Sequence, residues 1–479
     1  AAEAAEAEAL RQKLAPVVAR YADIGIRIYF TELGGAGIGG FDNHANQRDN
    51  HDALLKQLSA SLAAFADDLG RGRHLDRVAL MTFSEFGRTL SENGRRGTGH
   101  GAAAPVLLIG GRHLTTEDLR GGLQEMDHPQ MFHSITKWAG TAHDTARLPE
   151  YIATVARHAF SGRGGPVFLD IPWDVQAGMV EEDAIGWPTG YRSDRPAGLD
   201  DDTLAEVVGR LNGAERPVVF AGTGYRWSRS GDPTGALNGL VDALNAPAYL
   251  NSLARGSLRW DHPLLGNRTR SDALRSADVV LALGVDWDFR TGFGLKVAPD
   301  AAVIQVDAEP SRVGWNRAAS IGVVADPGAV AAQLADRVGR ADRSGWVEQI
   351  ATIERAKQDV ADEHAAIDTG PVHAERFARD VAEFFADDTI VAADGGDIVS
   401  TTAKWLRTSR PGGLLDPGPF GCLGVGAPFA LAAKAVEPNT RVGIVYGDGS
   451  FGFNGMEFDS LIRHGLPVVG VVGNDGAWN

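Results

Sequence analysis

The chain has 479 residues, 44% of them hydrophobic and 23% charged, a composition typical of a globular protein with several domains. The net charge of −16 argues against nucleic acid or an anionic membrane as a general partner, and no apolar run approaches the ~20 residues of a membrane helix. The single cysteine, Cys422, excludes an internal disulfide and a cysteine-cluster metal site. It lies in a glycine-rich turn, where we expect a small packing residue.

The first two regions of the chain predict alternating strands and helices. Residues 1–110 open with an Ala/Glu-rich helix, and a second, amphipathic helix is predicted at 49–69. The strands predicted within residues 1–110 are 24–30, 78–83 and 105–109. Residues 112–180 contain two helical stretches and a strand at 166–171, and the polar stretch 181–196, which contains proline, indicates a linker.

Residues 200–337 predict a further domain with buried parallel strands. The apolar segments 217–221, 277–284 and 302–307 are typical of such strands. Gly222-Thr223-Gly224 follows the first of them and has two interpretations, a dinucleotide-binding loop or a tight turn between strand and helix. A short glycine pattern alone favours the turn.

A charged helical stretch at 342–364 leads to the last region, residues 372–479. This region predicts a strand at 389–393, helices at 398–407 and 425–435, and a closing strand–helix–strand unit. The helix of that unit is expected at 453–465, with Phe458, Leu461 and Ile462 on one side and Gly465 at its end.

Polar clusters follow both strands of the closing unit. Gly447-Asp448-Gly449 ends the first strand and Asn474-Asp475-Gly476 ends the second. Because carboxyl ends of parallel strands meet at one edge of a sheet, we expect the clusters to be neighbours. Asp448 offers a carboxylate oxygen, Asn474 an amide oxygen and Gly476 a carbonyl, a ligand set that suits Mg²⁺ carrying a diphosphate.

These two clusters resemble the signature of thiamine diphosphate (ThDP) enzymes, a family with acetolactate synthases, 2-oxoacid decarboxylases and benzaldehyde lyases. The resemblance implies ThDP and Mg²⁺ as cofactors. It assigns Asp448, Asn474 and the Gly476 carbonyl to the metal. The neighbouring Gly447, Gly449 and Ser450 would then contact the cofactor.

The resemblance extends over about three-quarters of the chain. It implies the end of a pyrimidine-binding domain at 112–180, a central Rossmann-like domain at 200–337 and a truncated diphosphate-binding domain at 372–479. The segments that carry it are residues 122–127, 135–138, 165–172, 393–397 and 415–421. The last two resemble the subgroup of acetolactate synthase-like proteins and 2-hydroxyacyl-CoA lyases. The fold class is therefore α/β and multidomain, with parallel-sheet, three-layer domains of the ThDP-enzyme type and an unrelated α/β fragment at the N-terminus.

Three further positions acquire roles from the resemblance. Gly395 and Gly396 lie at a strand end that opens a helix, where backbone N–H groups are able to bind phosphate. Leu423 matches the bulky apolar residue that bends the cofactor so that its two rings approach each other. Glu457 is interpreted as a supporting or interface residue rather than an acid catalyst.

Residues 1–110 resemble a different family, domain of unknown function 1501, which is related to alkaline phosphatases and sulfatases. Asp42, His44, Glu85 and His100 are metal-ligand types, but Gly99 replaces an aspartate of the family pattern, so we favour ordinary surface chemistry. The glutamate that activates the cofactor in ThDP enzymes is not identifiable, and the surroundings of Glu32 do not match it. We interpret the chain as a chimera that also lacks a covering helix after Asn479.

The expected function is a ThDP- and Mg²⁺-dependent carbon–carbon lyase or ligase acting on a 2-oxoacid or a 2-hydroxyacyl-CoA. Because the activating glutamate is missing, we expect impaired or absent turnover, and the catalytic residues are unknown. The alternatives are a non-catalytic remnant of the fold and a metal-dependent phosphate or sulfate ester hydrolase in the N-terminal segment. We expect a cytoplasmic homo-oligomer, dimeric or tetrameric, with neither nucleic acid nor membrane as a partner.

Overall fold

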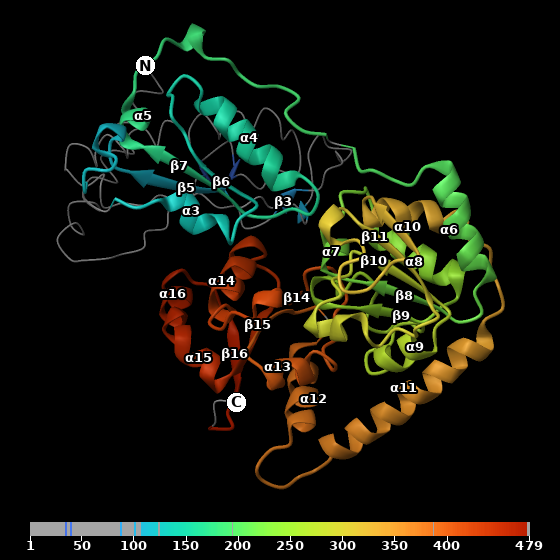
Figure 1. Ribbon diagram of the computed structural model, residues 1–479. Helices are drawn as coiled ribbons and strands as arrows, with labels where there is room; N and C mark the ends of the chain where they lie inside the picture. Colours follow the sequence, from blue (N-terminus) through green and yellow to red (C-terminus); the bar gives the residue numbers. More distant parts are fainter. Residues whose placement is uncertain are drawn as a thin grey trace. The chain divides into compact units, whose positions relative to one another are not determined.

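The computed structural model describes residues 107–122, 125–193, 195–386 and 388–476. It also describes four two-residue strands before them, β1 (Gly34–Gly35) paired with β2 (Gly39–Gly40) and β3 (Gly87–Arg88) paired with β4 (His100–Gly101). The chain divides into two compact units, Ala1–Ser193 and Asp194–Asn479 (Figure 1). The elements predicted at 24–30, 49–69 and 78–83 lie outside the described residues.

The first unit contains a three-stranded parallel sheet in the order β5-β7-β6. Its elements are β5 (Leu107–Arg112), η2 (Thr115–Glu117), α3 (His128–His133), β6 (Trp138–Thr141), α4 (Leu148–Phe160), β7 (Val167–Pro172), α5 (Trp173–Ala177) and η3 (Glu182–Ala184). The middle strand β7 is buried along its whole length, and α4 packs Val155 and Ala159 into the same core. The apolar pattern thus predicted β5 and β7, whereas β6, which is only half-buried, was missed.

The second unit begins with a five-stranded parallel sheet in the order β12-β11-β10-β8-β9. Its strands are β8 (Pro217–Ala221), β9 (Ala248–Leu250), β10 (Val279–Leu283), β11 (Ala302–Asp307) and β12 (Ile321–Val324). Its helices are α6 (Asp201–Gly213), α7 (Thr223–Arg226), α8 (Pro233–Leu244), α9 (Arg270–Ser276) and α10 (Pro327–Ala335), with short turns η4 (Ser252–Ala254), η5 (Phe289–Gly294) and η6 (Pro310–Arg312).

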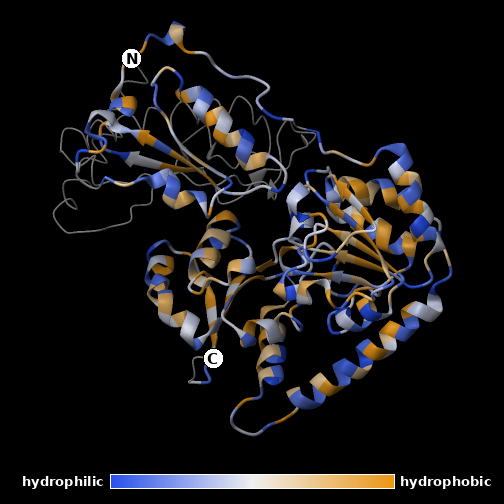
Figure 2. Ribbon diagram, in the orientation of Figure 1, coloured by the Kyte–Doolittle hydropathy of each residue, from blue (hydrophilic) through white to orange (hydrophobic). Residues whose placement is uncertain are grey.

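Both faces of this central sheet are covered. Val219 and Leu281 pack into one core with residues of α6, α8 and α10, while the next residues along, Phe220 and Ala282, pack into a second core. Successive side chains of a strand point to opposite faces, so buried strands must be apolar at every position. Figure 2 shows the resulting hydrophobic strands inside more polar helices.

The turn at Gly222–Gly224 is the tight turn that the sequence favours. Gly224 donates its backbone N–H to the carbonyl of Gly284 at 2.8 Å, and Gly222 donates to Leu283 at 3.0 Å. A Cβ on Gly222 would lie 2.6 Å from the Gly284 oxygen. These glycines therefore permit close packing against the end of β10, and two of their N–H groups are already used.

The rest of the second unit is a four-stranded parallel sheet in the order β14-β13-β15-β16, reached through the long helix α11 (Ser344–Ala365). Its strands are β13 (Ile390–Asp394), β14 (Leu414–Leu415), β15 (Val442–Gly447) and β16 (Val469–Gly473). Its helical elements are α12 (Ala374–Phe385), α13 (Asp397–Thr402), η7 (Gly418–Phe420), α14 (Gly426–Val436), α15 (Asp448–Asn454), η8 (Gly455–Glu457) and α16 (Phe458–Arg463). Alternate residues of β13 enter separate cores on its two faces.

Three local predictions for this region were wrong. The helix expected at 453–465 is three short pieces that begin at Asp448, because the ring of Phe451 packs over Gly455 and the chain tightens there into a 3₁₀ turn. Leu461 is buried, but Ile462 is 78% exposed, since the six-residue α16 does not bury a wide apolar stripe. Cys422 is exposed rather than packed, so its turn lies on the surface.

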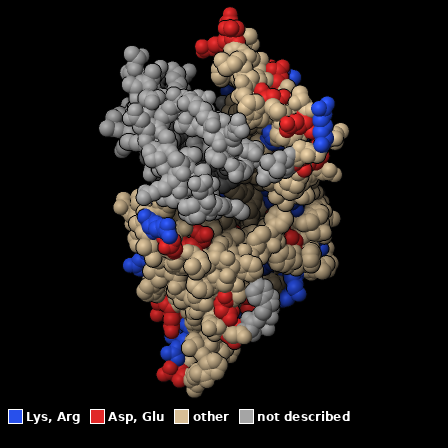
Figure 3. All heavy atoms as spheres, turned by 90° about the vertical axis from the view of Figure 1, so that its left-hand side faces the viewer, with Lys and Arg blue, Asp and Glu red and all other residues tan. Residues whose placement is uncertain are grey.

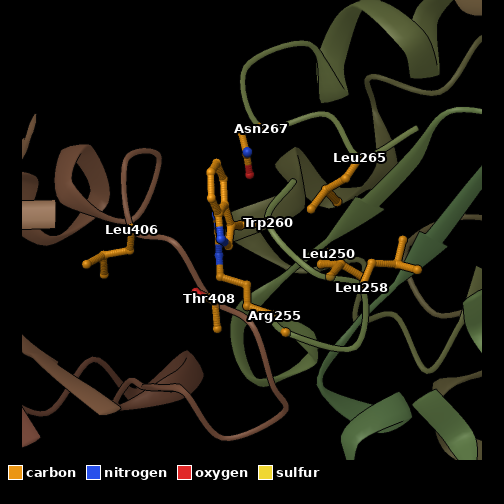
Figure 4. Close-up of a pocket in the computed structure, with 9 residues that line it drawn as sticks. Leu250, Arg255, Leu258, Trp260, Leu265, Asn267, Leu406 and Thr408 are labelled. Carbon is orange, nitrogen blue, oxygen red and sulfur yellow. The ribbon is translucent and has the colours of Figure 1, made fainter. Parts of the chain in front are cut away.

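A polar seam joins the two sheets of the second unit. Arg268 of the central domain lies 3.3 Å from Glu375 at the start of α12, and its guanidinium stacks over the ring of Trp405. The Trp405 indole donates to Glu375 at 2.5 Å. Nearby, the backbone N–H of Trp260 donates to the Thr408 carbonyl. Figure 4 shows the indole ring of Trp260 at a small pocket, between Leu406 and the central-domain residue Leu265.

Glu375→Gln should loosen this seam. Burial acts to raise the pKa of Glu375, but the Trp405 N–H and Arg268 outweigh it and hold the pKa below its usual 4.5. A lowered native pKa gives stability that is present above about pH 4.5 and is lost as the pH falls. We expect E375Q to lose about 1.5–3 kcal/mol at pH 7, the usual range for a hydrogen bond to a charged group, and to show a smaller deficit at pH 4, below the unfolded pKa.

Thermal unfolding of E375Q and of Glu383→Gln at pH 4 and pH 7 checks this expectation. Glu383 is exposed on the same helix and is the matched control. An E375Q deficit that is equal at both pH values would contradict the ionic role of the carboxylate.

Candidate functional site

The two polar clusters at the ends of β15 and β16 lie together. The strands pair in parallel with Gly447 opposite Gly473, so the residues that follow them start at the same sheet edge. The backbone N–H of Gly476 donates both to Asp448 Oδ2 at 3.2 Å and to Asn474 Oδ1 at 3.0 Å. The carboxylate and the amide oxygen are therefore within hydrogen-bond distance of one atom, as the strand–helix–strand pattern predicts.

Helix α15 fixes the first of these groups. Asp448 is its first residue, half-buried, and its Oδ1 accepts the backbone N–H of Gly449 at 2.9 Å. Ser450 is buried, and its hydroxyl lies 2.9 Å from the Gly447 carbonyl and 2.5 Å from the Asp394 carbonyl. Ser450 thus holds the loop in place through hydrogen bonds to two backbone carbonyls.

A glycine loop lies beside this edge at the end of β13. Gly395 has a φ of +147°, and a Cβ there would lie 2.8 Å from the backbone nitrogen of Gly447. A side chain at this position would meet the start of the Asp448 loop. Gly396 is exposed, has nothing within 4 Å of a Cβ position and precedes α13. The backbone is therefore accessible at Gly396 and tightly packed at Gly395.

The loop that carries Leu423 approaches the same region. Leu423 is half-buried, and the following residue, Gly424, has a φ of +85°. A Cβ on Gly424 would lie 2.9 Å from the side chain of Phe453 of α15, and the Asn454 amide donates to the Gly424 carbonyl. Contacts with α15 therefore fix the position of the Leu423 loop.

The donor chemistry of this edge fits a hard divalent cation with a bound diphosphate. Asp448 and Asn474 supply hard oxygen atoms, and both are at least partly accessible. Gly396 offers an uncovered backbone beside them. Mg²⁺ prefers one or two protein oxygens together with phosphate oxygens and water, and the exposed Asn474 and Gly396 leave this edge accessible to them.

The buried carboxylate of Asp394, at the end of β13, was missed by the sequence reasoning. Its Oδ1 accepts the N–H of Gly424 at 3.1 Å, and its Oδ2 accepts that of Gly426 at 2.7 Å. Burial raises the pKa of this carboxyl above its usual value, although these N–H groups act to lower it. The sequence did contain a signal for it, because Asp394 is a charged residue that ends an apolar strand and precedes two glycines.

Other predicted positions do not join this site. Glu457 Oε2 accepts the hydroxyl of Ser460 at 2.7 Å, a contact within the adjoining helical turns. Of the candidates in the N-terminal segment, Glu32, Asp42, His44 and Glu85 lie outside the described residues. His100 belongs to β4, which is described only as a strand.

The first unit contains one separate cluster of metal-ligand types among its described residues. Donor atoms of His113, Asp118 and Glu125 lie within 4.8 Å of one another. However, Arg112 already pairs with Asp118, and Glu125 accepts three backbone N–H groups from residues 119–122. The cluster is therefore an internally paired network. Arg112 also lies 3.7 Å from Asp170 of β7, a buried carboxyl whose pKa is raised by burial.

Comparison with known proteins identifies the family. Residues 204–334 match the family described as "Thiamine pyrophosphate enzyme, central domain", and residues 394–479 match "Thiamine pyrophosphate enzyme, C-terminal TPP binding domain". The chain is 37% identical over 378 residues to the "Acetolactate synthase large subunit IlvG" of Mycobacterium tuberculosis, covering 78% of this chain and 68% of that protein. The chain belongs to the thiamine diphosphate enzymes.

Within this ThDP family, the chain resembles two named groups. Mycobacterium bovis has a "Probable acetolactate synthase" with the same 37% identity and coverage. The "2-hydroxyacyl-CoA lyase 2" of Homo sapiens is 30% identical over 419 residues, which cover 79% of this chain and 65% of that protein. The chain thus spans about two thirds of the length of these relatives.

The N-terminal segment of this ThDP-family chain has a second match. Residues 4–113 match the family described as "Protein of unknown function (DUF1501)", in agreement with the resemblance read from the sequence. Among the described residues, no helix is both long and apolar enough to cross a membrane. On the described part of the face in Figure 3, acidic and basic side chains are interspersed.

Proposed function

We propose that the chain binds Mg²⁺ and ThDP at the edge formed by β13, β15 and β16. The observation that carries the proposal is the convergence of the Asp448 and Asn474 oxygens on one backbone N–H at neighbouring strand ends. A carboxylate oxygen and an amide oxygen lie at the carboxyl edge of a parallel sheet, next to an accessible glycine backbone. This combination suits a divalent metal ion bound to a diphosphate.

Each residue of the edge has a separate task in this proposal. Asp448, Asn474 and the carbonyl of Gly476 hold the Mg²⁺ ion, and the backbone at Gly395 and Gly396 orients the diphosphate. Leu423 supports the bend of the cofactor, and the backbone of Gly447 and Gly449 shapes the loop. Once bound, the cofactor supplies the nucleophilic carbon and the electron sink, and the protein supplies orientation and electrostatics.

The proposed reaction class is carbon–carbon bond cleavage or formation on a 2-oxoacid or a 2-hydroxyacyl-CoA. Its support is the names of the relatives, an acetolactate synthase and a 2-hydroxyacyl-CoA lyase. A homo-oligomer and a cytoplasmic location stay predictions. We further propose that turnover is weak, because the segment before the ThDP-family region matches another family and offers no identified activating glutamate.

Titration calorimetry with ThDP tests the binding proposal. We expect saturable binding that requires Mg²⁺, and much weaker binding of thiamine, because thiamine lacks the diphosphate that the metal holds. Equal binding of ThDP with Mg²⁺ and with a chelator would contradict the metal-bridged site. Exchange of the cofactor's C2 hydrogen, followed by NMR, then distinguishes an active enzyme from a binding-only remnant, for which we expect slow exchange.

A further inference from the structure

Asp394 touches each of the three segments that the proposed function assigns to the cofactor. Through the chain it is joined to Gly395 and Gly396. Through its carboxylate it holds the backbone N–H groups of Gly424 and Gly426, next to Leu423. Through its carbonyl it meets the hydroxyl of Ser450, two residues after Asp448. Gly424 is 30 positions and Ser450 is 56 positions from Asp394 in the sequence, and their segments meet around this one buried residue.

The carboxylate also caps a helix that has no cap of its own. Helix α14 runs for 11 residues from Gly426, and its N-cap residue, Val425, has no side chain able to accept a hydrogen bond. Free N–H groups at a helix start need an acceptor, and a negative charge there also interacts favourably with the helix dipole. Asp394, which is fully buried, provides both from the neighbouring strand.

Close packing leaves little space for an alternative arrangement. A Cβ on Gly426 would lie 3.0 Å from the Asp394 Cβ and 2.7 Å from the ring of Tyr446 of β15. The start of α14 is thus packed closely against β13 and β15. The hydrogen bond from Gly426 to the Asp394 carboxylate fixes the position of this helix start relative to the two strands. Since Leu423 lies immediately before Gly424, any movement of this helix start moves Leu423.

We infer that Asp394 is a positioning residue, which couples the loop carrying Leu423 to the diphosphate and metal loops through its hydrogen bonds to Gly424 and Gly426. The inference rests on the proposed function, because it concerns the conformation of the cofactor bound there. Asp394 is fully buried and its carboxylate accepts the N–H groups of Gly424 and Gly426, so we assign it an indirect effect through these residues. Its effect is on the placement of Leu423 relative to Asp448, and therefore on how strongly the bound cofactor is bent.

The test compares Asp394→Asn with Asp326→Asn. Asp326 is also buried and caps the nine-residue helix α10 by accepting the N–H groups of Gly328 and Ala329, each at 3.0 Å. Both variants replace a buried helix-capping carboxylate with an amide. The NH₂ group of the amide is a hydrogen-bond donor and cannot accept the backbone N–H groups of the helix start. Asp326 also accepts the Ser228 hydroxyl at 2.5 Å and the Arg229 N–H at 2.7 Å, so D326N should lose at least as much stability as D394N, whereas only D394N should alter the cofactor.

Three readouts are taken on the full chain. Hydrogen exchange without cofactor should show faster exchange of residues 424–428 in D394N only. Calorimetry with ThDP and Mg²⁺ should show about 10- to 100-fold weaker binding for D394N, the usual loss for residues that orient ligand-bearing groups, and unchanged binding for D326N. Near-ultraviolet circular dichroism at saturating ThDP should show a smaller signal from the bent cofactor in D394N.

The outcomes separate this inference from the proposed function. If the parent chain binds no ThDP, the proposed function fails and this inference fails with it. If the parent binds and D394N shows the parent's affinity and dichroism, the inference alone is overturned. Equal losses in D394N and D326N would also overturn it, because they would reflect general destabilisation.

Discussion

Asp448→Ala is expected to abolish Mg²⁺-dependent binding of ThDP while leaving the fold intact. The substitution removes the only carboxylate that the proposal gives to the metal, and Asn474 and a carbonyl are both uncharged. The loss should exceed the roughly 100-fold at the upper end for residues that merely orient a metal ligand. Calorimetry of ThDP at fixed Mg²⁺ measures it. Asn474→Ala should show a smaller loss, because an uncharged ligand contributes less to a cation site than a carboxylate does.

The matched control is Asp459→Ala. Asp459 lies 11 positions later on α16, is exposed and pairs with Arg463 at 2.6 Å. It carries the same charge, but its carboxylate pairs within α16. We expect its ThDP affinity to equal that of the parent. Unchanged binding by D448A would remove the carboxylate from the metal site and would leave the proposal without its central ligand.

Arg343→Met should strongly destabilise the central domain. The Arg343 guanidinium is buried and donates to the carbonyl oxygens of Leu211 and Leu244 at 2.7 Å and of Ala214 at 3.0 Å. These carbonyls lie at the C-terminal ends of α6 and α8, where a positive charge is favourable. Met has a similar length but no donor, so the variant buries unpaired carbonyls. Each buried acceptor left unpaired costs about 1–3 kcal/mol, so we expect a loss of about 3–5 kcal/mol for the three carbonyls together.

Native-state hydrogen exchange read by mass spectrometry suits this measurement, because it reports each helix separately in a chain of several domains. Protection of residues 201–213 and 233–244 should fall in R343M, while that of 426–436 should stay unchanged. Arg340→Met, at an exposed position three residues earlier, is the control. A uniform fall over the whole second unit would show that Arg343 acts on global unfolding rather than on these two helix ends.

The sequence predicted those parts of the structure in which local pattern and position coincide. The apolar runs at 217–221 and 302–307 match β8 and β11 residue for residue, because strands covered on both faces need continuous apolar sequence. The approach of Asp448 and Asn474 was also predictable. It follows from two parallel strands that end in polar residues, and it needs no knowledge of the remaining fold.

Contacts between distant segments were not predictable in this way. Nothing near Asp394 in the sequence indicates that Gly424 and Gly426 will donate to it, because that pairing depends on where α14 packs on the sheet. Arg343 likewise reads as an ordinary charged residue at the start of the helical stretch expected at 342–364, although it is buried against two other helix ends. The exposure of Ile462 was missed because a periodic pattern does not reveal that the expected helix is divided into α15, η8 and α16.

The most direct test of the proposed cofactor site is a crystal structure of the chain with ThDP and Mn²⁺ in place of Mg²⁺. We expect an anomalous scattering peak bound by the Asp448 carboxylate, the Asn474 amide oxygen and the Gly476 carbonyl, with the diphosphate beside Gly395 and Gly396. A diphosphate bound elsewhere, for example at the turn formed by Gly222–Gly224 in the central domain, would contradict it.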